Sequence, residues 1–197
     1  MVNLIKSVIM SFIKILEESF NEAECKSLLD LSSKHTFEFA PITINGAEGV
    51  FESRPDIRNN DRVILDDPWL AKTLLSIVKK ELPQEFDGSF LSRLNERFRF
   101  YRYSSGQQFK KHYDGSYVAS ESEESKLTLL IYLSDDFTGG ATKFFFEDRV
   151  DMEIKPVKGQ ILVFDHNILH SGEPVIEGCK YVLRTDVIYK RMGSTTG

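Results

Sequence analysis

Residues 127–133 read Leu-Thr-Leu-Leu-Ile-Tyr-Leu, a run of apolar and β-branched side chains without a charge. Such runs are typical of buried strands. Five more runs rich in Phe, Tyr, Ile, Leu and Val are spread over the second half of the chain, separated by Gly, Pro, Asp and Ser: residues 97–103, 141–146, 150–154, 160–164 and 181–189. Short strands at this spacing predict a small sandwich or barrel.

Two helices are predicted before these strands. Asn21 and Glu24 have the spacing of a capping box, which begins a helix that runs to about Ser33. Asp67-Pro68 begins a second helix, with apolar residues at helical spacing as far as Leu82. The sequence therefore predicts a mainly β fold whose core is supported on one side by α-helices.

The length of 197 residues predicts a single domain. We expect this domain to span residues 1–192, with helical support in 1–95, a β core in 96–190 and a disordered tail in 193–197. Asn45–Asn60 carries two Gly and one Pro and shows no clear period, so it is predicted to be a loop between the helices.

The composition excludes several classes of protein. There are 25 Lys and Arg against 30 Asp and Glu, a net charge of −5, and no basic block, which argues against a nucleic-acid partner. The two cysteines, Cys25 and Cys179, exclude a disulfide scaffold and predict a reducing, cytoplasmic compartment. Lys6 and Lys14 interrupt the apolar stretch Met1–Leu16, so neither a signal peptide nor a membrane span is predicted. No feature points to a particular oligomeric state.

His112 and Asp114 are two residues apart, so on an extended backbone their side chains project from the same face. A second histidine from a later strand would complete a triad of two histidines and one carboxylate, which leaves coordination positions open and suits non-haem Fe(II). His166 and His170 are the candidates for this third ligand. Taken alone, His-x-Asp is more often a surface histidine beside an aspartate than a metal site.

Several motifs surround this tripeptide in a particular order. Residues 103–114 follow Tyr-x-x-Gly-x-x-aromatic-x-x-His-x-Asp, and residues 132–142 follow Tyr-Leu-Ser-x-x-aromatic-x-Gly-Gly-x-Thr. His170 precedes a Gly-x-Pro-Val segment, and Lys180 comes ten residues later. Over about residues 97–189, this order resembles the prolyl 4-hydroxylase-like branch of the Fe(II)/2-oxoglutarate-dependent dioxygenases.

The resemblance implies a fold and a metal site. The fold would be a double-stranded β-helix, a jelly-roll or cupin-like core, with the N-terminal helices packed on one sheet. Fe(II) would be bound by His112, Asp114 and His170, because the distal histidine of the family is the one before the Gly-x-Pro-Val segment. His166 is not a ligand on this assignment.

The resemblance also implies the cosubstrate 2-oxoglutarate, whose C1 carboxylate and keto oxygen can chelate Fe(II). Its distal carboxylate needs a buried cation and a hydroxyl donor. Lys180 occupies the family position of the cation, and Tyr132 is the expected hydroxyl. Tyr103 has a position that reaches toward the same pocket in the family.

Arg184 is an alternative to Lys180. It lies four residues further on and has the same strand parity, so it would face the same cavity. Equally, it would form a structural ion pair with Asp165 or Asp186. We prefer Lys180 for the distal carboxylate.

The implied enzyme consumes 2-oxoglutarate and O₂, releases succinate and CO₂, and hydroxylates an unactivated C–H bond of a prolyl residue in a peptide or protein. Ascorbate would keep the iron reduced. The alternatives are a hydroxylase of a free amino acid or small metabolite, and a non-oxygenase metal-binding cupin-like protein. Asn45–Asn60 and Gly115–Lys126 are expected to flank the cavity mouth. There Arg54, Arg58 and Arg62 either engage an acidic or carbonyl-rich partner or belong to a solvated loop surface.

Overall fold

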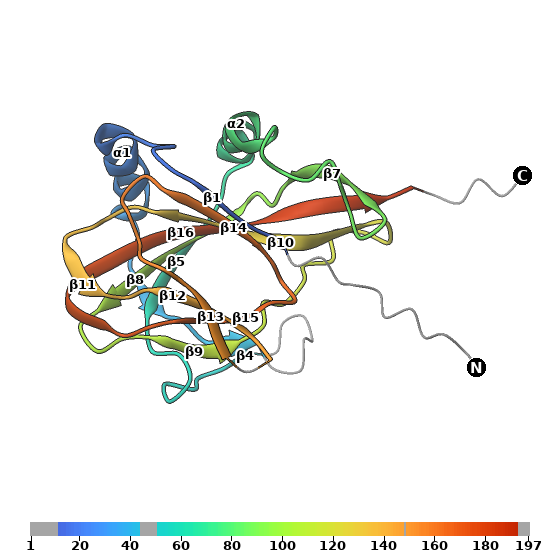
Figure 1. Cartoon of the computed structure of the whole chain (residues 1–197). Coiled ribbons are helices and arrows are strands. Elements are labelled where there is room, and N and C mark those ends of the chain that lie inside the picture. The colour runs from blue at the N-terminus through green and yellow to red at the C-terminus, as the bar shows by residue number, and fades with distance from the viewer. Residues whose placement is uncertain (1–11, 44–50, 148, 193–197) are drawn as a thin grey trace, which may run out of the picture.

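The computed structural model of the chain describes residues 12–43, 51–147 and 149–192. Within these ranges there are two helices, α1 (Glu22–Ser32) and α2 (Pro68–Val78), and the other regular elements are strands (Figure 1). The predicted tail at 193–197, residues 1–11 of the apolar N-terminal stretch and residues 44–50 of the predicted loop lie outside the described residues.

Ten antiparallel strands form a large sheet. Its main path runs in the order β1 (Ile13–Leu16), β14 (Ile161–Asp165), β10 (Glu123–Tyr132), β16 (Val175–Arg191), β8 (Arg97–Ser104), β5 (Asp61–Asp66) and β2 (Glu38–Phe39). Three more strands extend it: β11 (Phe137–Gly139) and β7 (Ser89–Leu94) pair with β16, and β6 (Glu85–Phe86) pairs with β7. The 17-residue β16 is therefore the centre of the sheet, because it pairs with four other strands.

A second sheet of four strands lies across one side of the large sheet (Figure 1). Its order is β13 (Arg149–Ile154), β12 (Thr142–Phe146), β15 (Leu169–Gly172) and β9 (Phe109–His112). A separate pair is formed by β3 (Ile42–Thr43) and β4 (Phe51–Glu52). The helices lie on the opposite side of the large sheet. The predicted jelly roll with helices packed on one sheet is confirmed.

Alternate residues of the large sheet project to opposite sides, and each side has its own core. On one side, strand residues pack against α1 and α2; they include Phe98, Phe100, Leu127, Leu129, Ile131, Leu183 and Val187. On the other side, strand residues pack against the small sheet; they include Tyr101, Tyr103, Tyr132, Leu162, Phe164 and Val182, with Phe144 and Ile154 across from them. The site described below belongs to this second side.

The starts of both helices are confirmed, since Asn21 forms a capping box with Glu24 and the Asp67 side chain accepts two backbone N–H groups. The predicted end of the second helix at Leu82 is wrong, because α2 ends at Val78. Pro83 disfavours helical backbone at the residue before it. Leu82 is nevertheless buried, so its side chain packs in the core although its backbone is outside the helix.

All six predicted strands are present, but strands in the first half of the chain were missed. The strands β1, β5 and β7 all belong to the large sheet. They are short, and charged residues begin, end or interrupt them, so they lack the long apolar runs that marked the others. Residues 13–94 therefore contribute strands to the sheet as well as the two helices.

Candidate metal centre

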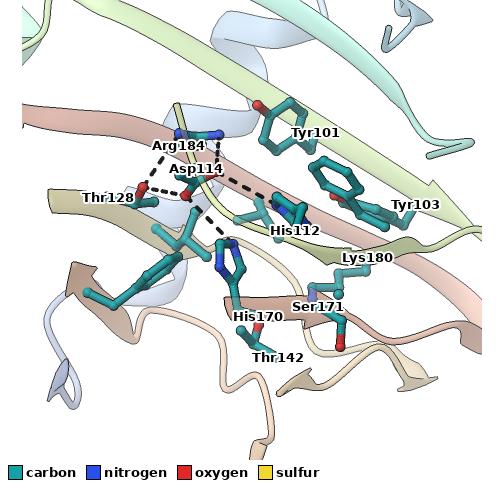
Figure 2. Close-up of a pocket in the computed structure, with 15 residues that line it drawn as sticks. Tyr101, Tyr103, His112, Asp114, Thr128, Thr142, His170, Ser171, Lys180 and Arg184 are labelled. Carbon is teal, nitrogen blue, oxygen red and sulfur yellow. Dashed lines mark hydrogen bonds and ion pairs between the residues drawn. The ribbon is translucent and has the colours of Figure 1, made fainter. Parts of the chain in front are cut away.

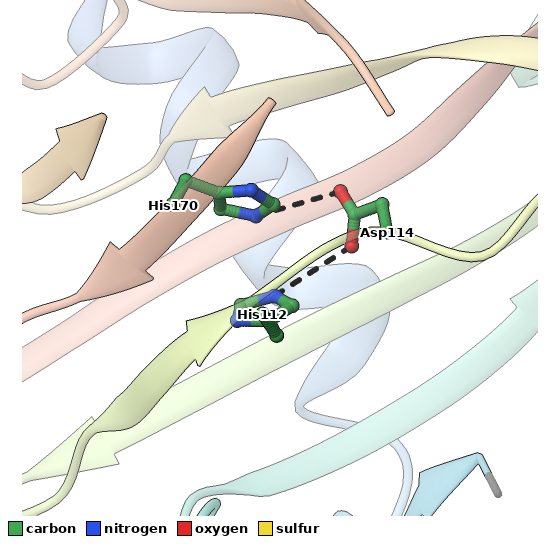
Figure 3. Close-up of side chains that lie close together, drawn as sticks. All are labelled: His112, Asp114 and His170. Carbon is green, nitrogen blue, oxygen red and sulfur yellow. Dashed lines mark ion pairs between the residues drawn. The ribbon is translucent and has the colours of Figure 1, made fainter. Parts of the chain in front are cut away.

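Strand pairing in the small sheet brings two histidines together. His112 ends β9, and the register of the β9–β15 pair places His170 directly opposite it. Asp114 follows two residues after His112, and all three side chains point to one spot (Figure 3). The Asp114 carboxylate lies 3.7 Å from Nε2 of His112 and 3.6 Å from Nε2 of His170. Their ligand atoms all lie within 4.8 Å of one another.

Both imidazole rings are held in the orientation that a metal ligand needs. Nδ1 of His112 donates to the Lys110 carbonyl at 2.7 Å, and Nδ1 of His170 donates to the Ile168 carbonyl at 2.9 Å. A carbonyl can only accept, so the ring proton is on Nδ1 and the Nε2 lone pair is free. Burial lowers the pKa of His112 to about 3 and also lowers the pKa of His170. Both rings are therefore neutral at pH 7.

The carboxylate of the triad is ionised. Burial opposes the charge of Asp114, but the Arg184 guanidinium and the nearby histidines hold the pKa of the carboxyl well below its usual range. Nη1 of Arg184 donates to Oδ1 at 2.9 Å, and the Thr128 hydroxyl donates to Oδ2 at 2.5 Å. Two neutral imidazoles and one carboxylate, each oriented by a partner, are a donor set that fits Fe(II).

A pocket extends from the triad toward Lys180, and Figure 2 shows the side chains that line it. Lys180 is 5% exposed, and its Nζ donates to the Gly140 carbonyl at 2.5 Å. No carboxylate among the described residues pairs with this ammonium, and burial lowers its pKa to about 7. Tyr103 lies opposite Lys180 in the β8–β16 ladder, and its ring centre is 5.7 Å from Nζ. A buried cation without an anion suits an anionic ligand.

Tyr132 lies behind the pocket wall. It is fully buried, and its hydroxyl shares a 2.9 Å hydrogen bond with the Thr142 hydroxyl. Thr142, not Tyr132, lines the pocket. Thr142 is the last residue of the Gly-Gly-x-Thr motif, but no role was predicted for it. Thr128 was also missed, because one hydroxyl within an apolar strand carries no signal of its own.

Arg184 lines the pocket and also forms the ion pair that was its alternative role. Its Nη2 lies 3.1 Å from Asp186 Oδ1, and its Nη1 contacts the Asp114 carboxylate. Asp165 is not its partner; that carboxylate instead accepts from the backbone N–H of Asn167. Arg184 therefore supports a triad residue rather than standing free as Lys180 does.

His166 is buried next to Asp114, whose backbone N–H donates to the His166 carbonyl at 3.3 Å, but its side chain does not join the triad. Its Nε2 lies 3.9 Å from Asp186 Oδ1, and within the described chain neither ring nitrogen has a hydrogen-bond partner. It does not line the pocket.

The described helices include none long and apolar enough to cross a membrane.

Comparisons with known proteins point to one family. Residues 98–185 match the model of the 2OG-Fe(II) oxygenase superfamily. Probable prolyl 4-hydroxylase 9 of Arabidopsis thaliana is 32% identical over 111 residues, which are 44% of this chain and only 38% of that protein. A putative prolyl 4-hydroxylase of Acanthamoeba polyphaga mimivirus is 24% identical over 188 residues, or 85% of this chain and 70% of the relative.

Solved structures share the fold. The viral collagen prolyl hydroxylase of Paramecium bursaria Chlorella virus-1, in its 2OG complex, has a TM-score of 0.61 and 22% identity, covering 91% of this chain and 96% of its own. A prolyl hydroxylase of Trichoplax adhaerens, in complex with a peptide fragment of the hypoxia inducible factor oxygen degradation domain, has a TM-score of 0.68 and 16% identity. That alignment covers 89% of this chain and 82% of the Trichoplax chain.

Proposed function

We propose that this chain is a 2-oxoglutarate-dependent dioxygenase of the 2OG-Fe(II) oxygenase superfamily and that it hydroxylates a prolyl residue of a peptide or protein. The family-model match over residues 98–185 and the prolyl 4-hydroxylase relatives support the proposal. In the balanced reaction, one atom of O₂ becomes the hydroxyl of the product and the other enters succinate, while 2-oxoglutarate loses CO₂. The observation that carries the proposal is the convergence of His112, Asp114 and His170 beside the buried, anion-free Lys180.

His112, Asp114 and His170 would hold the iron. When bound, Fe(II) supplies the activation of O₂ that C–H hydroxylation requires. The chain supplies orientation: the backbone carbonyls fix both imidazoles, and Arg184 with Thr128 fixes the carboxylate. Phe164 packs edge-on against His170 at 4.6 Å between ring centres and helps to keep water from that ligand. Ascorbate would serve to keep the iron reduced.

Lys180 would bind the distal carboxylate of 2-oxoglutarate. Its ammonium already donates one hydrogen bond to Gly140 and has no carboxylate partner among the described residues. Thr142 would supply the hydroxyl contact, with Tyr132 holding that hydroxyl from behind. Tyr103 would close the side of the pocket next to the ammonium. This assignment keeps Lys180 and moves the direct hydroxyl role from Tyr132 to Thr142.

The prolyl substrate is supported by the relatives, which are named as prolyl 4-hydroxylases, and by the peptide bound to the Trichoplax enzyme. The alternative substrates are a free amino acid or a small metabolite. A cytoplasmic location stays a prediction from the two cysteines, both of which are free thiols.

An anaerobic titration tests the core of the proposal. Fe(II) and 2-oxoglutarate together should produce the weak visible charge-transfer band of a chelated keto acid, and His112→Ala should abolish that band. With O₂, proline-containing peptides should gain one oxygen by mass spectrometry while succinate is released in equal amount. Absence of the band in the wild type would refute the dioxygenase site. Oxygen gain on free proline, with none on any peptide, would refute the peptide substrate.

A further inference from the structure

Arginines gather around Tyr101, which lines the pocket two residues before Tyr103 on β8. The Arg58 guanidinium lies 4.5 Å from the centre of the Tyr101 ring. Arg62 is the register partner of Tyr101 in the β5–β8 pair. Arg99 precedes Tyr101 by two residues and so projects to the same side, where Arg184 is its partner on β16. Four cations from three segments of the chain, residues 58–62, β8 and β16, therefore lie around one phenol.

Carboxylates balance only part of this charge. Asp186 pairs with Arg99 and Arg184, at 3.1 Å each, and Asp114 pairs with Arg184. Arg58 and Arg62 form no ion pair with any carboxylate among the described residues. Two positive charges next to the pocket are therefore left without a partner.

The surroundings of Arg58 make this imbalance costly. The residue is 5% exposed, and its Nε donates to the Asn60 side chain at 2.7 Å. Its Nη2 is buried and has no hydrogen-bond partner in the described chain. A buried guanidinium nitrogen without an acceptor is destabilising, so its retention points to a ligand. Arg62 is half-buried, with the Phe51 ring centre 5.9 Å away, and the exposed Glu38 is its register partner in β2.

The electrostatic effect appears at Tyr101 itself. Burial alone would raise the pKa of the phenol, but Arg58, Arg184 and Arg99 lower it to about 8. The field at this position therefore favours a negative charge.

Arg58 lies close to the candidate metal centre. Arg58 is also 4.5 Å from the Phe109 ring, and Phe109 stacks on His112 with 3.4 Å between ring centres. Tyr101 and Phe109 both line the pocket. Tyr103, which neighbours Lys180, is two residues further along β8, and Figure 2 shows Tyr101 and Tyr103 on successive positions of this wall. Arg58 therefore contacts two residues that line the pocket, although neither Arg58 nor Arg62 lines it.

We propose that Arg58, Arg62 and the Tyr101 hydroxyl form a second anion site, which binds a carboxylate of the substrate. The inference rests on the proposed function, because Lys180 is assigned there to the cosubstrate, which leaves Arg58 and Arg62 for the substrate. The carboxylate has two possible sources. It is an acidic side chain near the target proline of a peptide, or the α-carboxylate of a free amino acid.

Matched pairs of probes separate these sources. The first set consists of short peptides that contain a single proline. In each peptide one Glu occupies one of the two positions before or the two positions after that proline, and a second peptide with Gln in place of this Glu is its match. The other pair is L-proline and L-prolinamide. Binding is measured by calorimetry, anaerobically, with Fe(II) and 2-oxoglutarate present. We expect the carboxylate member of one pair to bind at least about tenfold more tightly, as a charge-assisted contact provides.

Three variants test the residues. Arg62→Gln and Arg58→Gln should each reduce the preference for the carboxylate probe to less than about threefold. Arg54→Gln is the matched control: Arg54 is in the same segment but pairs with the exposed Asp56, so this variant should keep the wild-type preference. Thermal unfolding checks that each variant is folded. Because Arg58 is buried, Arg62→Gln decides the outcome if Arg58→Gln does not fold.

The outcomes separate this proposal from the proposed function. Equal or absent binding of both members in every pair would overturn the anion site, while the visible band of Fe(II) with 2-oxoglutarate would still support the dioxygenase. Carboxylate preference without that band would support the anion site and refute the dioxygenase assignment. Loss of 2-oxoglutarate affinity in Arg62→Gln would show that these arginines hold the cosubstrate instead, which also overturns the proposal.

Discussion

The two sides of the large sheet are built from the same strands but have opposite character. On β10, Leu127, Leu129 and Ile131 face the helices, and all are at most 1% exposed. Thr128 and Leu130, which alternate with them, line the pocket. On β16, Leu183 and Val187 belong to the helix-side core, whereas Lys180 and Arg184 line the pocket with Val182 between them.

This contrast shows how the period of two in a strand divides stability from chemistry. The helix side contains apolar side chains and requires no partner beyond close packing. The pocket side contains charges that are unfavourable in a buried place unless each meets an opposite charge. We therefore expect substitutions on the helix side to change mainly the free energy of unfolding, and those on the pocket side to change mainly ligand binding. Five predictions test this division, from the largest expected effect to the smallest.

Asp114→Ala should abolish Fe(II) binding and turnover. Loss of a residue that merely supports a ligand typically costs about 10–100-fold in metal affinity, and loss of the ligand itself costs more. The measurement is a Co(II) titration followed by the visible spectrum. His166→Ala is the control and should keep most of the metal affinity, because His166 does not line the pocket. If His166→Ala lost the metal and His170→Ala kept it, the assignment of the distal ligand would be reversed.

Leu129→Ala should reduce the free energy of unfolding by about 2–5 kcal/mol, because it leaves a cavity in the helix-side core. Its neighbour Leu130 is half-buried and lines the pocket, so Leu130→Ala should cost less stability. Urea denaturation gives the stability, and calorimetry gives the 2-oxoglutarate affinity. Leu129→Ala should keep the 2-oxoglutarate affinity within about twofold of the wild-type value, whereas Leu130→Ala should weaken it by more than that. The reverse pattern would contradict the division of the sheet.

Arg184→Met should weaken metal binding by about 10–100-fold while changing 2-oxoglutarate affinity much less. The reason is that Arg184 orients the Asp114 carboxylate, through a 2.9 Å contact, and does not stand free for another anion. Metal titration and cosubstrate titration of the same variant separate the two effects. A large loss of 2-oxoglutarate affinity with normal metal binding would assign Arg184 to the distal carboxylate.

Lys180→Met should do the opposite, reducing 2-oxoglutarate affinity by at least about tenfold, because a charge-assisted contact is lost. It should also make the ligand-free protein more stable. The pKa of Lys180 is about 7 in the folded protein, below its ordinary value of 10.5. The unfolded chain therefore binds more protons between these values, and burial of the ammonium opposes folding.

The pH dependence follows from the same difference. The wild type should gain stability relative to Lys180→Met as the pH rises from 7 toward 10.5, since the penalty of the buried charge disappears over that range. Denaturation of both proteins at pH 7 and pH 9 measures this. 2-Oxoglutarate affinity of the wild type should fall as the pH rises above 7, because its carboxylate prefers the ammonium form. A stability difference independent of pH would contradict the depressed pKa.

The smallest effect is expected at the hydroxyl pair. Tyr132→Phe removes the support behind Thr142 and should weaken 2-oxoglutarate binding by about two- to threefold, near the lower limit for one neutral hydrogen bond. Thr142→Val should have a larger effect, since Thr142 lines the pocket and Tyr132 does not. Cosubstrate titration of both variants compares them. A larger loss in Tyr132→Phe would restore Tyr132 as the direct contact.

Local sequence patterns were sufficient to predict six of the strands, the starts of both helices and several candidate site residues. The six apolar runs predicted strands that are present, and Asn21 and Asp67 marked the start of each helix. His112 and Asp114 share a face because they are two residues apart. The order of motifs singled out His170 and Lys180, which line the same pocket in the structure. These features depend on spacing within a segment or on motif order, which a sequence contains in full.

The tertiary structure decided which distant side chains meet. Register between β9 and β15 sets His170 against His112. Packing of the small sheet against the large one brings Asp114, which follows β9, to Arg184 on β16. Thr142 and Tyr132 share a hydrogen bond, but only Thr142 lines the pocket. Which of the two hydroxyls faces the pocket was decided by the tertiary packing. The cluster around Tyr101 likewise joins three segments, residues 58–62, β8 and β16. Such contacts depend on register between strands far apart in the chain, and a shift by one residue would turn every side chain to the other side of the sheet.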